Sequence, residues 1–371
     1  MILNDSLLKN EEKAIFALRE LYAAYGYSQY KMSKFEEYDL YVRNKDFLIS
    51  DSVITFTDTN GKLMALKPDV TLSILKNCKD KSGQVQKVYY NENVYRVSGA
   101  THSFKEIMQV GLECIGDIDD YALYEVLLLA AKSLASISVS SVLDISHLGI
   151  IEALFDALGI DDGERTQMLK CIGEKSVHSL TAICEKCSVS KEDTELLKSL
   201  ITLYGKPSDI VPKLFSLLDG KIDSAPLIQF SNILSALENT EIYNMLRIDF
   251  SVIHDIGYYN GIVFKGFIEG IPEGVLAGGQ YDKLLYKMGR KSGAIGFAVY
   301  LDLLERINSS EKQSDVDILL IYKDNTPLSS LAKAVKDLSA NGKSVMAQKG
   351  IPEKIKYAEL MKLDESGVSK I

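Results

Sequence analysis

The sequence of 371 residues lacks several features that mark specialised classes of protein. It has no run of about 18 uncharged apolar residues, the length needed to cross a membrane. Its first residues, MILNDSLLKNEEK, carry acidic side chains where a signal peptide has a basic and then an apolar stretch. Its 5 cysteines are an odd number scattered along the chain, which favours reduced thiols over disulfides. We therefore expect a cytoplasmic protein that does not associate with a membrane.

An excess of positive charge is absent as well. The chain has 42 Lys and Arg against 51 Asp and Glu, a net charge of -9, so no overall positive field favours a polyphosphate backbone. We therefore expect no tRNA partner, although a local basic groove on an acidic protein would escape this count. With 46% hydrophobic residues, the chain can bury a sizeable core in one large domain plus one or two smaller ones.

The spacing of apolar residues predicts a mixed, mainly antiparallel α+β domain over residues 1–308. The expected helices span residues 10–25, 121–136 and 280–288. The expected strands span residues 27–32, 52–57, 62–66, 86–91, 93–97, 107–115, 247–253, 261–268 and 274–277, before a strand-to-helix passage over 293–307. From about 148 to 244 the strand signal disappears and apolar residues recur at helical spacing, which predicts a helical insertion.

The C-terminal residues follow a polar stretch, 309–314, that has the composition of a linker. A buried-strand pattern over 315–322, an amphipathic helix over 327–340 and a second strand over 344–348 then predict a βαβ unit within residues 315–371. This unit is small for an independent domain.

Several polar residues in short segments form a set that suits a zwitterion. Asp69 and Glu113 are carboxylates and Gln109 is an amide, and together such groups can satisfy an ammonium. Arg96 can hold a carboxylate by a charge-assisted hydrogen bond. A free amino acid carries both of these groups.

Five segments, in this order, resemble signature segments of histidyl-tRNA synthetase over roughly residues 10–305. They are residues 26–36, with Ser33 where the class II motif has proline; 66–71, similar to Leu-Arg-Pro-Glu-Gly-Thr; 95–96 with 109–113; 258–264; and 278–282, similar to Gly-Gly-Arg-Tyr-Asp. The resemblance implies a class II aminoacyl-tRNA synthetase-like antiparallel sheet flanked by helices, and a homodimer built through the first segment. It also implies an amino-acid pocket formed by Asp69, Thr71, Arg96, Gln109, Glu113, Tyr258 and Tyr259.

The ATP half of the synthetase pattern is not kept. Residues 97–104 lack the Glu and Arg that the family uses for adenine and phosphates, with Ser98 and Ser103 at about those places. His254 stands where the family has an arginine, and Gly257 where it has an aspartate. Residues 296–303 parallel Gly-Phe-Ala-Met-Gly-Leu-Glu-Arg, so Leu303 occupies the position of the ATP-binding arginine. An apolar leucine cannot stabilise phosphate charge.

A histidine half that is partly kept beside an ATP half that is lost looks like the regulatory subunit of ATP phosphoribosyltransferase, the first enzyme of histidine biosynthesis. The resemblance implies a non-catalytic protein without a cofactor, a catalytic residue or a metal site. It further implies a hetero-oligomer with the short catalytic subunit, which this protein activates while contributing to feedback inhibition by histidine, a candidate ligand. The small C-terminal unit agrees, because a synthetase carries a complete anticodon-binding domain.

Other interpretations remain open. The chain could be a divergent histidyl-tRNA synthetase, or another synthetase paralogue that binds an amino acid. Tyr258 and Tyr259 could be core aromatics, Asp69 an acid that stabilises a helix N-terminus, and Arg96 and Glu113 a pair across neighbouring strands. The cysteines of the helical insertion, Cys171, Cys184 and Cys187, with His178, could bind zinc, but three-residue spacing on a helix favours simple packing.

Overall fold

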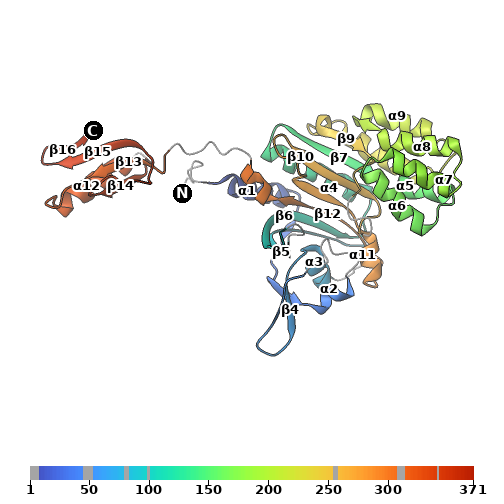
Figure 1. Cartoon of the computed structure of the whole chain (residues 1–371), viewed down its shortest axis with the longest axis horizontal. Coiled ribbons are helices and arrows are strands. Elements are labelled where there is room, and N and C mark those ends of the chain that lie inside the picture. Colours follow the sequence, from blue (N-terminus) through green and yellow to red (C-terminus); the bar gives the residue numbers. More distant parts are fainter. Residues whose placement is uncertain are drawn as a thin grey trace. The chain divides into compact units, whose positions relative to one another are not determined.

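The computed structural model describes residues 8–44, 53–78, 83–97, 101–253, 258–306, 314–340 and 342–371. The chain divides into two units, Met1–Ile307 and Asn308–Ile371 (Figure 1). Within the described ranges, no helix is both long enough and apolar enough to span a membrane.

A large mixed sheet forms the centre of the first unit (Figure 1). Among the described residues it has nine strands in the order β1-β5-β6-β12-β11-β10-β7-β9-β8. Their bounds in that order are Ser28–Gln29, Val85–Val97, Phe104–Gly116, Gly293–Tyr300, Leu276–Gln280, Ile262–Ile268, Ser141–His147, Leu246–Asp249 and Tyr204–Gly205. The pairs β1–β5 and β7–β9 are parallel and the others antiparallel, which confirms the predicted, mainly antiparallel α+β class.

Two helices, α1 (Asn10–Ala24) and α4 (Asp120–Ile137), pack on one face of this sheet. Helix α4 begins where the Asp119 carboxylate accepts a hydrogen bond from the Ala122 amide at 2.9 Å, a cap that satisfies an otherwise unpaired donor. The Tyr22 hydroxyl of α1 lies 3.0 Å from the Ser133 hydroxyl of α4, so even the polar tip of this buried tyrosine has a partner. The main apolar core lies between these helices and the sheet.

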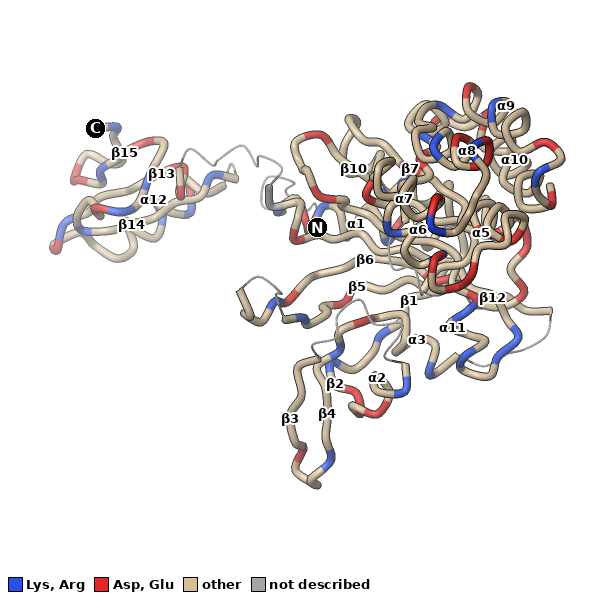
Figure 2. Tube along the Cα trace, turned by 45° about the vertical axis from the view of Figure 1, so that its right-hand side comes forward, with Lys and Arg blue, Asp and Glu red and all other residues tan. Residues whose placement is uncertain are grey.

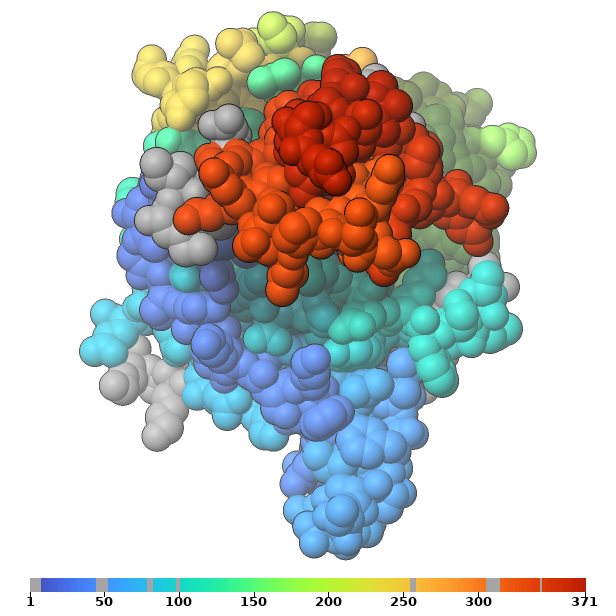
Figure 3. Space-filling model, turned by 90° about the vertical axis from the view of Figure 1, so that its left-hand side faces the viewer, coloured from blue at the N-terminus to red at the C-terminus, as the bar shows by residue number. Residues whose placement is uncertain are grey.

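The opposite face carries a second core and three short helices, α2 (Asp39–Arg43), α3 (Thr71–Asn77) and α11 (Asp282–Lys287). Alternation along β5 sends Tyr89 to the first core and Tyr90 to the second, as the two-residue period of a strand requires. A small sheet of β2 (Phe35–Glu37), β4 (Leu63–Leu66) and β3 (Thr55–Thr57) adjoins this side. Its β3–β4 hairpin projects from the unit (Figure 3).

Six helices follow β7 along the chain: α5 (Leu148–Ala157), α6 (Asp162–Gly173), α7 (Val177–Lys186), α8 (Lys191–Thr202), α9 (Pro207–Leu218) and α10 (Ala225–Leu237). They bury apolar stripes against one another, and their outer surfaces carry interspersed acidic and basic residues (Figure 2). The expectation of no strand between 148 and 244 was wrong in one detail. The two-residue strand β8 pairs with the sheet edge at β9, a contact that local spacing cannot reveal.

The structure also differs from the predicted strands, most clearly at β5 and β7. Residues 86–91 and 93–97 form one strand, β5, because Asn91 and Asn93 pair opposite Val110 and Met108 of β6 instead of making a turn. Strand β7 was not predicted, since its serine-rich sequence resembles a loop. It lies between β10 and β9, inside the β8 edge of the sheet, where its neighbours supply the hydrogen bonds on both sides.

The second unit has its own sheet, in the order β14-β13-β15-β16, and the helix α12 (Leu328–Ser339). The strands are Val316–Ile321 for β13, Val345–Gln348 for β14, Tyr357–Asp364 for β15 and Gly367–Lys370 for β16. Strands β13, β14 and β15 are parallel, and β16 returns antiparallel to β15. The predicted βαβ unit is therefore extended by a hairpin, whose alternating charged residues hid its strand pattern.

Candidate functional site

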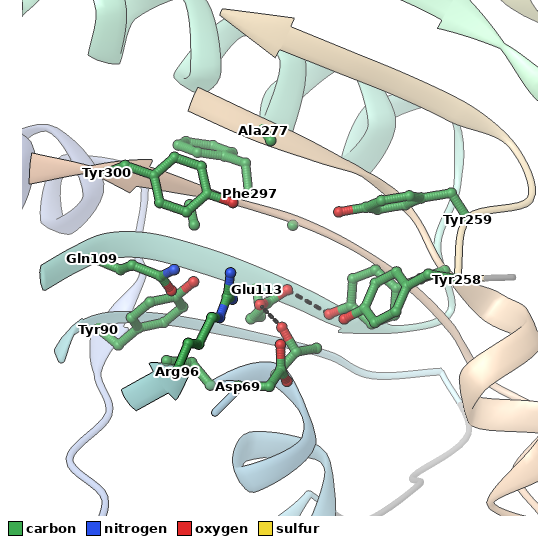
Figure 4. Close-up of a pocket in the computed structure, with 15 residues that line it drawn as sticks. Asp69, Tyr90, Arg96, Gln109, Glu113, Tyr258, Tyr259, Ala277, Phe297 and Tyr300 are labelled. Atoms are coloured by element: carbon green, nitrogen blue, oxygen red, sulfur yellow. Dashed lines mark hydrogen bonds between the residues drawn. The ribbon is translucent and has the colours of Figure 1, made fainter. Parts of the chain in front are cut away.

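A pocket lies on the face of the large sheet that carries α3 and α11 (Figure 4). The seven predicted site residues all line it, and they come from four separate stretches of the chain. They are Asp69, Thr71, Arg96, Gln109, Glu113, Tyr258 and Tyr259. The structure thus brings the predicted set together, while its binding of a ligand stays a prediction.

Glu113 lies at the bottom of the pocket with its side chain almost completely buried. Its carboxylate accepts a hydrogen bond from the Thr71 hydroxyl at 2.7 Å and another from the Tyr281 hydroxyl (Figure 4). Burial raises the pKa of Glu113 to about 8, although both hydrogen bonds act to lower it. A cation placed beside this carboxyl group would favour its ionised form at neutral pH.

Asp69 is the second acid of the pocket, and the start of α3 holds it in place. Its Oδ1 accepts a hydrogen bond from the Leu72 amide at 2.8 Å, so the side chain also caps the helix. The negative charge of Asp69 contributes to the raised pKa of Glu113. Two acids that oppose each other's ionisation are suited to share a positively charged ligand group.

Arg96 supplies the positive charge. Its Nε donates a hydrogen bond to the Pro68 carbonyl at 3.2 Å, which fixes the guanidinium of β5 beside the start of α3. The alternative that Arg96 and Glu113 pair across neighbouring strands was wrong. The register places Lys105 opposite Arg96 and Val88 opposite Glu113, so the two side chains are directed to the site from different positions along the hairpin.

Aromatic side chains form the remaining walls. Tyr258 and Tyr259 meet edge to face, with ring centroids 4.8 Å apart, and Tyr258 also contacts Tyr281 at 5.3 Å. The hydroxyl of Tyr259 points into the pocket (Figure 4). Burial raises the pKa of Tyr258 well above its usual value, so this phenol stays neutral and can donate a hydrogen bond.

Sequence reasoning missed several pocket residues, namely Tyr90, Tyr281, Phe297 and Tyr300. Tyr281 lies within the segment 278–282 that resembles the family, so its place near the pocket could have been predicted. Its hydrogen bond to Glu113 could not, because the two residues are far apart in the sequence. Gly296 of β12 shows why this strand needs a glycine beside the pocket. It pairs opposite Glu113, and a Cβ at this position would overlap the Glu113 carboxylate.

The cavity is small, about 40 Å³, which is room for roughly three waters. Even a single amino acid therefore requires small side-chain adjustments on entry. The charges of the residues that line the pocket suit one small zwitterion.

The positions that depart from the synthetase pattern divide into two groups. Ser98, His254 and Gly257 lie outside the described residues, while Ser103 is exposed. Leu303 packs against the main apolar core and is not among the residues that line the pocket. In the helical segment, Cys171 and Cys184 are buried in the same core and Cys187 packs against it, as the packing interpretation expects.

A model of the family described as histidyl-tRNA synthetase matches residues 3–304 of this sequence. The chain belongs to this family. An ATP phosphoribosyltransferase regulatory subunit from Oceanobacillus iheyensis is 25% identical over 355 residues, which cover 94% of this chain and 87% of that protein. This relative confirms the predicted resemblance to such regulatory subunits.

Solved structures confirm the synthetase-like fold. One is described as an ATP phosphoribosyltransferase regulatory subunit/histidyl-tRNA synthetase from Bacillus halodurans C. It has a TM-score of 0.77 and 22% identity, and the match covers 97% of this chain and 96% of that one. A chain of the ATP phosphoribosyl transferase (HisG:HisZ) complex from Thermotoga maritima has a TM-score of 0.61 and 18% identity, with 81% of this chain and 98% of that chain covered.

Proposed function

We propose that this protein is a regulatory subunit of ATP phosphoribosyltransferase and catalyses no reaction itself. The observation that carries the proposal is the contrast between the pocket and position 303. Acidic, amide and aromatic groups suited to an amino acid line the pocket, while Leu303, at the place of the synthetase's ATP-binding arginine, is partly buried against the main core. The name of the Oceanobacillus iheyensis relative supports the same conclusion.

The proposed partner is the short catalytic subunit of ATP phosphoribosyltransferase, in a hetero-oligomer that contains a homodimer of this chain and no tRNA. The resemblance to a chain of the Thermotoga maritima complex supports such an assembly. Histidine is the proposed ligand of the pocket and the cytoplasm the proposed location. Histidine acts by its different affinity for the active and inactive assemblies, because a ligand shifts an equilibrium only by that difference.

The deciding experiment measures phosphoribosyltransferase activity of the short catalytic subunit from the same organism, with and without this chain, at several histidine concentrations. We expect activation by the chain and reversal by histidine. The variant Asp69→Asn, which alters the pocket and keeps the helix cap, should activate as well as the wild type but require more histidine for inhibition. No activation and no co-elution of the two chains would refute the proposal.

The alternative of a divergent histidyl-tRNA synthetase has its own test. Histidine-dependent exchange of pyrophosphate into ATP requires adenylate formation, and hence cationic groups that stabilise charge on phosphates. We expect no exchange above the background without enzyme. Robust exchange would show a catalytic synthetase and would exclude the regulatory proposal in its present form.

A further inference from the structure

Tyr300 occupies one end of the pocket and was not assigned a role by sequence reasoning. It is the last residue of β12 and pairs opposite Gln109 of β6, so the two side chains share one face of the sheet. The Tyr300 amide donates a hydrogen bond to the Val275 carbonyl at 2.8 Å. The backbone of Tyr300 therefore pairs with β6 on one side and bonds to the Val275 carbonyl on the other, which fixes the position from which its ring extends.

The tyrosines of the pocket stand at opposite ends (Figure 4). Tyr300 lies above Gln109 at one end, and Tyr258 and Tyr259 form the other end. The residues that carry charge, Asp69, Arg96 and Glu113, lie between these two ends (Figure 4).

This arrangement orients an amino acid. Its ammonium belongs beside Asp69 and Glu113, and its carboxylate beside Arg96. The ligand side chain then extends toward the Tyr258 end, where a phenol and an aromatic wall are available. The carboxylate is left facing Tyr300.

Tyr300 is half-buried, and Tyr90 lies on the same face of the sheet, since Gly111 pairs with Tyr90 on one side and with Ala298, two residues before Tyr300, on the other. Tyr90 is almost fully buried there, and its hydroxyl lies so close to Gly111 that a Cβ on that glycine would overlap it. Because Tyr300 lines the pocket at this end, a group attached to the ligand's carboxyl carbon would meet its ring. In the synthetase segment that residues 296–303 resemble, a glycine stands at this position.

We propose that Tyr300 restricts the pocket to free α-amino acids by closing the end at which the ligand's carboxylate lies. Amides with bulky substituents, peptides and other carboxyl-extended derivatives are excluded by contact with its ring. The inference deepens the proposed function, and it rests on that proposal in taking the ligand to be an amino acid. Tyr300 acts here as a specificity-determining residue through its bulk, with no chemical step.

The test compares ligands that differ only in size beyond the carboxyl carbon. Histidinamide and histidine benzylamide both carry the ammonium and the imidazole, and both lack the carboxylate charge. Dissociation constants for the two, and for histidine, are measured by titration calorimetry on the full chain. For the wild type we expect the benzylamide to bind at least about tenfold more weakly than histidinamide.

Two variants separate bulk from the hydroxyl group. Tyr300→Gly should bring the ratio of the two amide dissociation constants close to one, and Tyr300→Phe should keep the wild-type ratio because the ring remains. Tyr300→Ala, with less backbone freedom than glycine, provides the same readout should Tyr300→Gly unfold. A ratio that stays unchanged in the glycine and alanine variants, or equal binding of both amides by the wild type, would overturn the inference.

The proposed function is judged by a separate measurement, the activation of the catalytic subunit. Should the wild type bind another amino acid better than histidine, the same comparison uses the amide and benzylamide of that amino acid. Binding of none of the 20 amino acids would overturn the inference about Tyr300. A failure of activation with an intact size ratio would overturn only the regulatory role.

Discussion

The pocket and the helical segment from α5 to α10 bury very different side chains. The helices are packed by residues such as Leu154, Phe155 and Leu197, each almost fully buried and apolar. The pocket buries Asp69 and Glu113 instead, and the position of Glu113 costs enough to raise its pKa to about 8. Burial of apolar side chains stabilises the fold, whereas burial of acids lowers its stability. A pocket that buries acids is therefore better explained by function than by stability.

The largest effect, on folding stability, is expected from removing an apolar side chain from the core of the helical segment. Leu197→Ala in α8 removes a fully buried side chain from the main core and should lower the free energy of unfolding by about 2–5 kcal/mol. Denaturant unfolding followed by circular dichroism measures this change. Ser199→Ala on the exposed side of the same helix should change stability by no more than about 0.5 kcal/mol. Equal losses for both variants would contradict the assigned core.

A smaller effect, on binding and not on stability, is expected from the polar side. Asp69→Asn removes the charge that we propose faces a ligand's ammonium, but it retains an oxygen that can cap α3. We expect amino-acid binding to weaken by about 10–100-fold, as for the loss of a charged hydrogen-bond partner, with the unfolding midpoint nearly unchanged. Titration calorimetry and thermal unfolding provide the two measurements.

Asp119→Asn is the matched control, because Asp119 caps α4 with the same geometry and does not line the pocket. This variant should bind as the wild type does. Equal loss of affinity in both variants, or a large loss of stability in Asp69→Asn alone, would show that the acid at position 69 serves structure and not the ligand.

The smallest expected signal is the release of up to about one proton from Glu113 when a ligand binds. Since the pKa of Glu113 is raised to about 8, the empty pocket holds a proton at pH 7 that an ammonium ligand should expel. We expect release of up to about one proton per site. The affinity should rise with pH until the pH exceeds the pKa of Glu113 in the ligand-free protein. Calorimetry in two buffers of different ionisation enthalpy measures the release.

Glu113→Gln should abolish this release while keeping an oxygen that can accept the Thr71 or the Tyr281 hydroxyl hydrogen bond. Comparison with the variant also removes any contribution from the ligand's own titrating groups. Proton release that is the same in the variant and the wild type would place the titrating group elsewhere.

Sequence reasoning predicted residues that line one pocket more successfully than it predicted the strands. Asp69, Arg96, Glu113 and Tyr259 were found because their residue types and order resemble a family pattern, which carries information about neighbours in space. Strand β7 was missed and β5 was divided in two, because serine and asparagine are poor strand formers and only pairing with adjacent strands offsets that preference. The prediction of the pocket's aromatic residues was incomplete, because nothing in the local sequence distinguishes Tyr90 and Tyr300 from other tyrosines in strands.

The sequence by itself determined the α+β class, the helical character of residues 148–244 and the chemical types available for binding, because periodicity and side-chain chemistry are local properties. Only the tertiary structure decided that Gly296 must be glycine opposite Glu113, that Arg96 and Glu113 are not cross-strand partners and that Tyr300 lines the pocket. Those facts depend on strand register. Register is set by pairing between residues far apart in the chain, and a shift of one residue would turn each of these side chains to the other face.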